Sequence, residues 1–162
     1  MEYSLIKLLH IGSLVFWLGV PLGAWLVLKT AERNHPENNT LLQQVSQVFF
    51  ITLIIEHIAF ALLLISGSWM AISYGWWNTA WLNQKLWLVG AILLPLEIVD
   101  IVLGNFIAAK ASARFYQQRS LSLWQKRALS IYHGSFTKIA IIIIPIAVIL
   151  IMYLAISKTP LM

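Results

Sequence analysis

The chain has 162 residues, of which 60% are hydrophobic and only 10% are charged, and its mean hydropathy is +0.80. Soluble domains are usually about 25% charged, and a fold of this length cannot bury so much apolar surface, so lipid must cover it. The sequence contains no cysteine, which excludes disulfides, thiolate metal sites and cysteine nucleophiles.

Four apolar runs are long enough to cross a hydrocarbon core, which takes about 20 helical residues. In chain order they cover residues 8–28, 48–72, 86–109 and 139–156. Only helices and closed β-barrels satisfy all backbone hydrogen bonds in lipid. The four runs do not show the alternation of apolar and polar residues that is typical of barrel strands, so we predict four transmembrane helices. The sequence therefore predicts an all-α polytopic membrane protein, with one transmembrane domain over residues 1–162 folded as an up-down four-helix bundle.

The segments between the apolar runs differ in character. The polar stretch ERNHPENNT separates the first two runs, and the short aromatic stretch YGWWNTAW separates the next two. The longer basic stretch KASARFYQQRSLSLWQKR precedes the last run. We expect it to continue the third helix for a few turns and then to begin the fourth helix as an amphipathic segment.

Basic residues are distributed unequally between the two ends of the predicted bundle. The first and third loops with their flanks carry eight lysines and arginines, and the opposite side carries three. The eight are Lys29, Arg33, Lys110, Arg114, Arg119, Lys126, Arg127 and Lys138, and the three are Lys7, Lys85 and Lys158. The positive-inside rule then places both loops in the cytoplasm and both termini outside. The formal charge of +5 therefore reflects orientation and does not indicate nucleic-acid binding.

Several titratable residues fall inside the predicted spans. An acidic residue at the middle of a membrane helix costs about 2.5–3.5 kcal/mol on insertion scales, yet Glu56, Glu97 and Asp100 all occupy such positions. Antiparallel packing would bring these three and His57 to a similar depth, in the cytoplasmic half of the bundle. His133 would approach from the cytoplasmic side. We therefore predict one intramembrane polar cluster of five residues.

The residue types in this cluster are compatible with three roles. A buried, mutually hydrogen-bonded cluster with one or more protonated carboxyl groups would simply fix helix packing. Carboxyl groups beside an imidazole also suit a pathway for protons or ions, or a site for a divalent metal. Glu97 and Asp100 are spaced Glu-x-x-Asp, which is not the Glu-x-x-His motif of di-iron bundles.

A second pair of residues lies at the other end of the predicted bundle. His10 is just inside the first span, and Lys85 opens the third span on the same side. An imidazole facing the interior can ligate haem iron, and a nearby lysine can bind a propionate or act as a second ligand. The simpler interpretation is an interfacial histidine beside a lysine that extends to the headgroups.

The two ends of the sequence resemble a known family. The opening YSLIKLLHIGSLVFWLGVPLG and the closing FTKIAIIIIPIAVILIMYLAISKTP are similar to both ends of a family of small four-span bacterial integral membrane proteins of unknown function. More distantly, the Leu-His-Ile start and the stretch WLNQKLWL resemble the haem-dependent membrane protoporphyrinogen oxidases and the copper-resistance D-type membrane proteins. The oxidase resemblance implies that His10 and Lys85 match residues implicated in haem binding, with haem b as the cofactor.

Three functional hypotheses follow. The first is a small integral inner-membrane protein of this family that binds b-type haem and acts in membrane redox chemistry. The alternative is that the protein uses the carboxylate–histidine cluster to transport protons or metal ions, or serves as an accessory membrane subunit. The third hypothesis is a purely structural subunit of a larger complex. Expected partners are the lipid bilayer and either haem or another membrane subunit. The sequence leaves open whether the protein is an enzyme.

Overall fold

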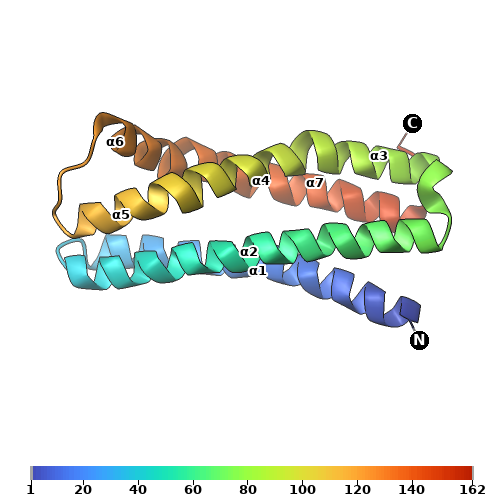
Figure 1. The fold of residues 1–162 in the computed structure, drawn as a ribbon, viewed down its shortest axis with the longest axis horizontal. Coiled ribbons are helices and arrows are strands. Elements are labelled where there is room, and N and C mark those ends of the chain that lie inside the picture. The colour runs from blue at the N-terminus through green and yellow to red at the C-terminus, as the bar shows by residue number, and fades with distance from the viewer. Residues whose placement is uncertain (1, 162) are drawn as a thin grey trace.

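The computed structural model describes residues 2–161, which fold into four long helical runs joined by short connections (Figure 1). The first two runs are the helices α1 (Glu2–Asn34) and α2 (Asn39–Ser73). The third run spans Ala80–Tyr116 and the fourth spans Leu123–Ser157. Each run is long and apolar enough to cross a membrane. The all-α prediction is confirmed, and each predicted span lies inside one run.

The third and fourth runs consist of α-helical and π-helical segments in alternation. Between the second and third runs there is also a short 3₁₀ turn. Its bounds and those of the other segments are η1 (Trp76–Asn78), α3 (Ala80–Leu88), η2 (Val89–Leu93), α4 (Leu94–Asp100), η3 (Ile101–Ala108), α5 (Ala109–Tyr116), α6 (Leu123–Ser130), η4 (Ile131–Phe136) and α7 (Thr137–Ser157). Three of the segments, η2, η3 and η4, are π-helical. Because π-bulges often occur at functional sites, their position around α4 and at the start of the fourth run directs attention there.

Side-chain caps define where two of the helices begin. The Asn38 side chain accepts a hydrogen bond from the backbone N–H of Leu41, which satisfies one free donor at the start of α2. At the start of α6, Ser122 and Gln125 form a reciprocal capping box. The predicted break between the third and fourth helices is therefore confirmed, with α5 continuing the third run to Tyr116.

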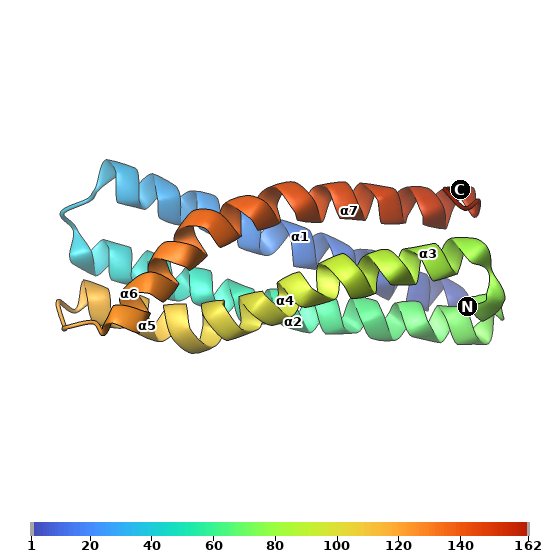
Figure 2. The ribbon, with the colours of Figure 1, turned by 90° about the horizontal axis from the view of Figure 1, so that it is seen from above.

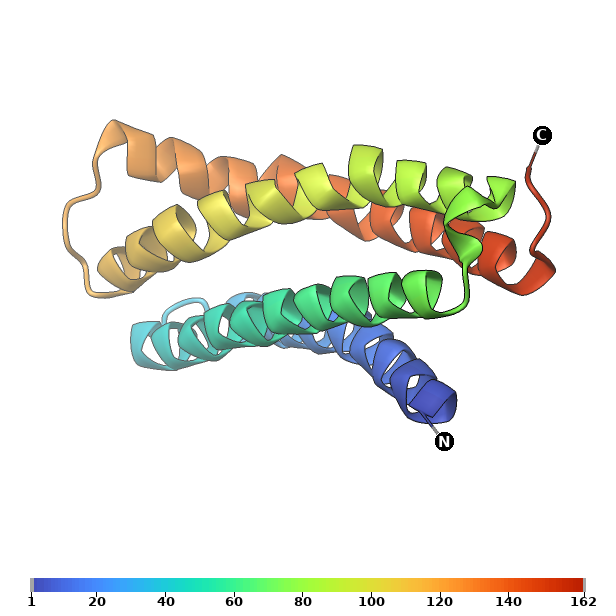
Figure 3. The same cartoon turned by 45° about the vertical axis from the view of Figure 1, so that its right-hand side comes forward.

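The four runs lie along the long axis of the molecule, and both termini lie at the same end (Figures 1 and 2). Helix α1 packs against α2 over much of its length, α5 packs against α2, and α3 packs against α7. Figure 3 shows α1 and α2 on one side and the third and fourth runs on the other. The two sides meet in the middle of the molecule, through buried apolar residues that include Trp17, Phe60, Leu93 and Val148.

Apolar side chains also cover much of the outer surface. Large hydrophobic residues are exposed along every run, for example Phe16, Ile58, Phe106 and Ile149. Water would solvate such a surface poorly, because exposed apolar patches of this extent are rare in soluble monomers. The exposed faces of the helices are therefore consistent with contact with lipid.

Candidate functional site

Three carboxyl groups are buried near the middle of the helical runs. Glu56 lies midway along α2, and Glu97 and Asp100 lie on α4. Their residues are 8%, 4% and 9% exposed, respectively. All three lie near mid-length of their helical runs, because α2 and the third run extend beyond their apolar segments.

His57 joins the two acidic residues of α4. Its Nδ1 atom lies 2.8 Å from Oε1 of Glu97, a hydrogen-bonding distance. On the other side of the ring, Nε2 lies 3.9 Å from Oδ2 of Asp100 and has no hydrogen-bond partner within residues 2–161. The imidazole therefore lies between two carboxyl groups, hydrogen-bonded to that of Glu97 and at ion-pair distance from that of Asp100.

Two further side chains, from α1 and η4, complete the cluster. The indole Nε1 of Trp17 donates a hydrogen bond of 3.2 Å to Oε2 of Glu97. The Tyr132 hydroxyl, which belongs to one of the most buried side chains, interacts electrostatically with the Asp100 carboxyl. All four helical runs thus contribute a residue to the cluster, and the carboxyl groups of Glu97 and Asp100 contact the residues from the other three runs.

Tyr132 also packs closely against the backbone of the third run. A Cβ atom built on Gly104 would lie 2.9 Å from the Tyr132 Oη and 3.0 Å from its Cζ. Only glycine accommodates the ring in this position without a shift. Both residues belong to π-helical segments, η3 and η4, so the irregular turns of the two runs meet at the cluster.

A cavity of about 140 Å³, partly open to the outer surface, adjoins the cluster. The cavity lies between α1 and α7, and Glu56, Glu97, Asp100 and Tyr132 all line it. The rest of its wall is mainly apolar and aromatic, with Trp17, Leu18, Pro21, Leu22, Trp25, Phe49, Leu53, Leu96, Phe136, Thr137, Ala140, Ile141, Ile144 and Pro145. The buried carboxyl groups therefore border a space large enough for several water molecules or one small ligand.

Glu56 differs from the other two carboxyl groups in its contacts. It is influenced electrostatically by Asp100 and Glu97, but no hydrogen bond joins its side chain to another residue of the described chain. The indole Nε1 of Trp25, which also lines the cavity, is buried and lacks a partner as well. The cavity wall therefore holds one carboxyl group that no hydrogen bond from the described chain satisfies.

The structure places His133 away from this hydrogen-bonded group. Its ring lies beside Phe49 and Phe50, and it is influenced by the charges of Lys29 and Glu32 near the end of α1. Its neighbour Tyr132 contacts the cluster instead. Sequence reasoning selected the histidine and missed the tyrosine, because the π-helical turn η4 changes which side of the helix faces inward.

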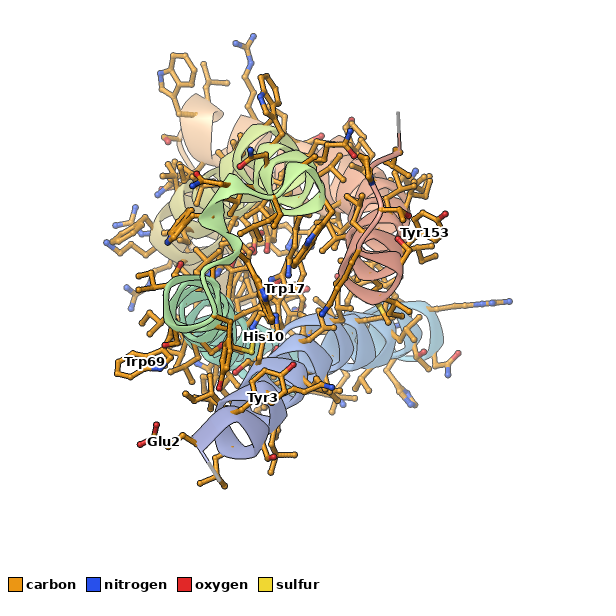
Figure 4. All side chains as sticks on the ribbon, turned by 90° about the vertical axis from the view of Figure 1, so that its right-hand side faces the viewer. Glu2, Tyr3, His10, Trp17, Trp69 and Tyr153 are labelled. Atoms are coloured by element: carbon orange, nitrogen blue, oxygen red, sulfur yellow. The ribbon has the colours of Figure 1, made fainter. Side chains whose placement is uncertain are left out.

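His10 faces α2 at the opposite end of the molecule. Figure 4 shows His10 and Trp17 inside the bundle, whereas Trp69 and Tyr153 point outward. The Nδ1 atom of His10 lies 3.0 Å from the Oγ of Ser66. The imidazole also packs against Gly67, where a Cβ atom would lie 3.0 Å from its Cε1.

The hydrogen bonds of Ser66 favour one tautomer of His10. The Ser66 hydroxyl donates to the backbone oxygen of Leu62 at 2.6 Å, which leaves its oxygen able to accept a hydrogen bond from a protonated Nδ1 of His10. That assignment leaves Nε2 unprotonated, as an axial ligand requires. The charge of Lys85 acts on the same imidazole. Neither His10 nor Lys85 lines the cavity beside the acidic cluster.

Over residues 2–161, no three histidine, aspartate or glutamate side chains are arranged to hold a metal ion together. Comparison with protein-family models, curated proteins and solved structures finds no match to this chain.

Proposed function

We propose that the protein spans the bacterial inner membrane as an up-down bundle of four helices, with both termini outside, and that it exchanges protons at the buried cluster during transport. The lipid-facing apolar surface and the unequal distribution of basic residues support this placement. The family resemblance of the two chain ends agrees with it. The hydrogen bonding of the buried cluster supports the proton exchange.

The observation that carries the proposal is the incomplete hydrogen bonding of the cluster beside a cavity. A cluster that only fixes helix packing would be expected to satisfy its buried polar atoms within the protein, because each unsatisfied one costs about 1–3 kcal/mol. Glu56 instead faces the cavity without a hydrogen-bond partner among the described residues, and Nε2 of His57 also lacks one. Groups that must gain and lose a proton need such free sites.

The geometry provides a route for a proton through the imidazole. A proton taken up at one ring nitrogen of His57 can be matched by release from the other, because the two nitrogens face different carboxyl groups. Glu97 and Asp100 thereby exchange protons without moving far. Tyr132 extends the path by one hydroxyl from Asp100, and Glu56 connects the group with the cavity.

Infrared spectroscopy of the purified protein in lipid nanodiscs tests the proposal. The band of protonated carboxyl groups is recorded while the buffer is changed from acidic to alkaline. We expect part of this band to disappear on alkalinisation, and Glu56→Gln to remove a component of the change. Glu37→Gln is the matched control, because Glu37 is an exposed acidic residue in the loop after α1.

The same experiment separates proton exchange from a packing role. A cluster that only holds the helices together would keep its protons throughout, and Glu56→Gln would alter thermal stability without altering the pH-dependent band. A carboxyl band that is insensitive to pH in the parent protein would refute the proposed function.

A second function, haem binding in membrane redox chemistry, is favoured by the tautomer of His10. The hydrogen bond to Ser66 orients the ring and leaves Nε2 available as an axial ligand. His10 would hold the iron of a b-type haem and Lys85 would interact with a propionate, while the haem would supply one-electron redox chemistry.

Absorbance spectroscopy tests the haem proposal directly. Protein purified after expression with abundant haem should show a Soret band that His10→Ala abolishes or shifts. The matched control is His35→Ala, because His35 is exposed in the loop after α1. A parent protein without a Soret band would exclude this function and leave the proton proposal unaffected.

A further inference from the structure

We propose that the cavity between α1 and α7 binds a small organic cation, an ammonium group attached to a compact apolar body, which reaches it from the lipid and exchanges with the proton on Glu56. This inference rests on the proposed proton exchange, and it assigns the class of solute that the exchange would drive.

The volume of the cavity limits the size of the ligand. A cavity of about 150 Å³ lined by apolar side chains accommodates one benzene molecule, and this cavity measures about 140 Å³. The volume therefore matches a single ring or a short branched chain. Water alone would fill the polar side but would be poorly held along Leu18, Leu53 and Ile144.

The charges around the cavity determine the sign of the ligand. Glu56, Glu97 and Asp100 all line it, and no lysine, arginine or histidine does. Glu56 has no hydrogen-bond partner in the described chain and its residue is 92% buried, so a donor arriving in the cavity would meet a free carboxyl group. An anion would meet only repulsion, whereas an ammonium group would supply the missing donors.

The remaining wall favours a cation that carries an apolar group. Trp17, Trp25, Phe49 and Tyr132 present aromatic surface to the cavity, and aromatic faces attract ammonium groups in desolvated sites. Aliphatic side chains cover the other parts of the wall. A bare metal ion would leave this apolar surface unused, which agrees with the lack of a metal-holding group in residues 2–161.

Two prolines face this space from opposite helices. Pro21 lies inside α1 and Pro145 inside α7, and both line the cavity. A proline in a helix removes the hydrogen bond to the carbonyl group four residues earlier. The carbonyl groups released in this way belong to Trp17 and Ile141, which are themselves lining residues. Both helices that border the cavity therefore carry a carbonyl group without its usual intrahelical donor.

The rim of the cavity indicates the route of entry. Leu22 on α1 and Ile141 on α7 line the cavity and are 44% and 36% exposed. The cavity therefore reaches the outer surface between two lipid-facing helices, past apolar side chains. A solute with an apolar body would partition into lipid first and then place its charged end against Glu56.

The probe for this site is benzylammonium, and its neutral isostere benzyl alcohol is the control ligand. Binding to the full chain in nanodiscs is followed by tryptophan fluorescence and by calorimetry. We expect saturable binding of benzylammonium and at least about tenfold weaker binding of benzyl alcohol, which corresponds to about 1.4 kcal/mol. Binding should weaken as the buffer is acidified, because protons compete for Glu56.

Two variants test the position of the ligand. Glu56→Gln should weaken benzylammonium binding by about tenfold or more, whereas the loop variant Glu37→Gln should bind like the parent. Ala140→Leu should also abolish binding, because it adds three carbon atoms to the cavity wall without altering a carboxyl group. This second variant keeps the test valid if Glu56→Gln does not fold.

Three results would overturn the inference: no saturable binding by the parent, equal binding of the alcohol, or binding that neither variant reduces. The proposed function fails separately, by loss of the pH-dependent carboxyl band. A parent protein that shows this band but does not bind benzylammonium would retain proton exchange and lose only the organic-cation assignment.

Discussion

Gly104 offers the sharpest test of how the fold holds the site, because Tyr132 packs directly on its Cα. A methyl group added by Gly104→Ala would approach three Tyr132 atoms, Oη at 2.9 Å, Cζ at 3.0 Å and Cε2 at 3.1 Å. These atoms belong to a rigid ring that is 2% exposed, so the ring or the helix must move. Overpacking of this kind costs about 1–3 kcal/mol.

A glycine in a matching position provides the control. Gly90 lies in the π-helical segment η2 of the same run, and a Cβ atom there would meet no described atom within 4 Å. Both substitutions gain helix propensity, at most about 1 kcal/mol, so this gain cancels in the comparison. Gly104→Ala should therefore be about 1–3 kcal/mol less stable than Gly90→Ala.

Thermal unfolding of the detergent-purified variants, followed by circular dichroism, measures this difference. For a chain of this size 1 kcal/mol corresponds to roughly 2–4 °C in Tm. The displaced Tyr132 should also disturb the Asp100 contribution to the infrared carboxyl band, which Gly90→Ala should leave unchanged. Equal unfolding temperatures for the two variants would show that Tyr132 does not pack on Gly104, and the site geometry would have to be redrawn.

Three further predictions test the packing around the site and the topology. The hydroxyl groups of Ser46 and Ser112 lie 2.7 Å apart and are buried. The double variant Ser46→Ala with Ser112→Ala should therefore lose less unfolding free energy than the sum of the losses of the two single variants. Additive losses would contradict this pairing. Trp17→Phe removes the donor to Glu97 and should lower stability by about 1.5–3 kcal/mol, whereas Trp69→Phe on the exposed surface should change it by less than about 0.5 kcal/mol. A C-terminal alkaline phosphatase fusion should be active in the periplasm, and activity restricted to a cytoplasmic reporter would reverse the proposed orientation.

Much of the fold follows from the sequence because the strongest physical constraint acts locally. Each apolar run is long enough for one helix, and backbone groups surrounded by apolar side chains must bond within their own segment. The breaks are also local, since Asn38 and Ser122 cap the helices that follow them. Helix number, order and approximate bounds could therefore be predicted before any tertiary contact was known.

The sequence also indicated which acidic residues needed explanation. Glu56, Glu97 and Asp100 stand out because a carboxyl group is expensive in an apolar helix wherever that helix packs. His57 followed from its position next to Glu56. This inference depends on composition and depth alone, which are properties of each helix by itself.

Only the tertiary structure decided how these residues are used. Trp17 and Tyr132 carry no sequence signal that separates them from other buried aromatic residues, and they join the cluster because their helices cross at its level. Regular 3.6-residue periodicity cannot say whether Tyr132 or His133 faces inward, since the π-helical turn η4 shifts the register. The cavity and the free carboxyl group of Glu56 arise where α1 and α7 do not fill the space between them, and that depends on the packing of side chains far apart in the chain.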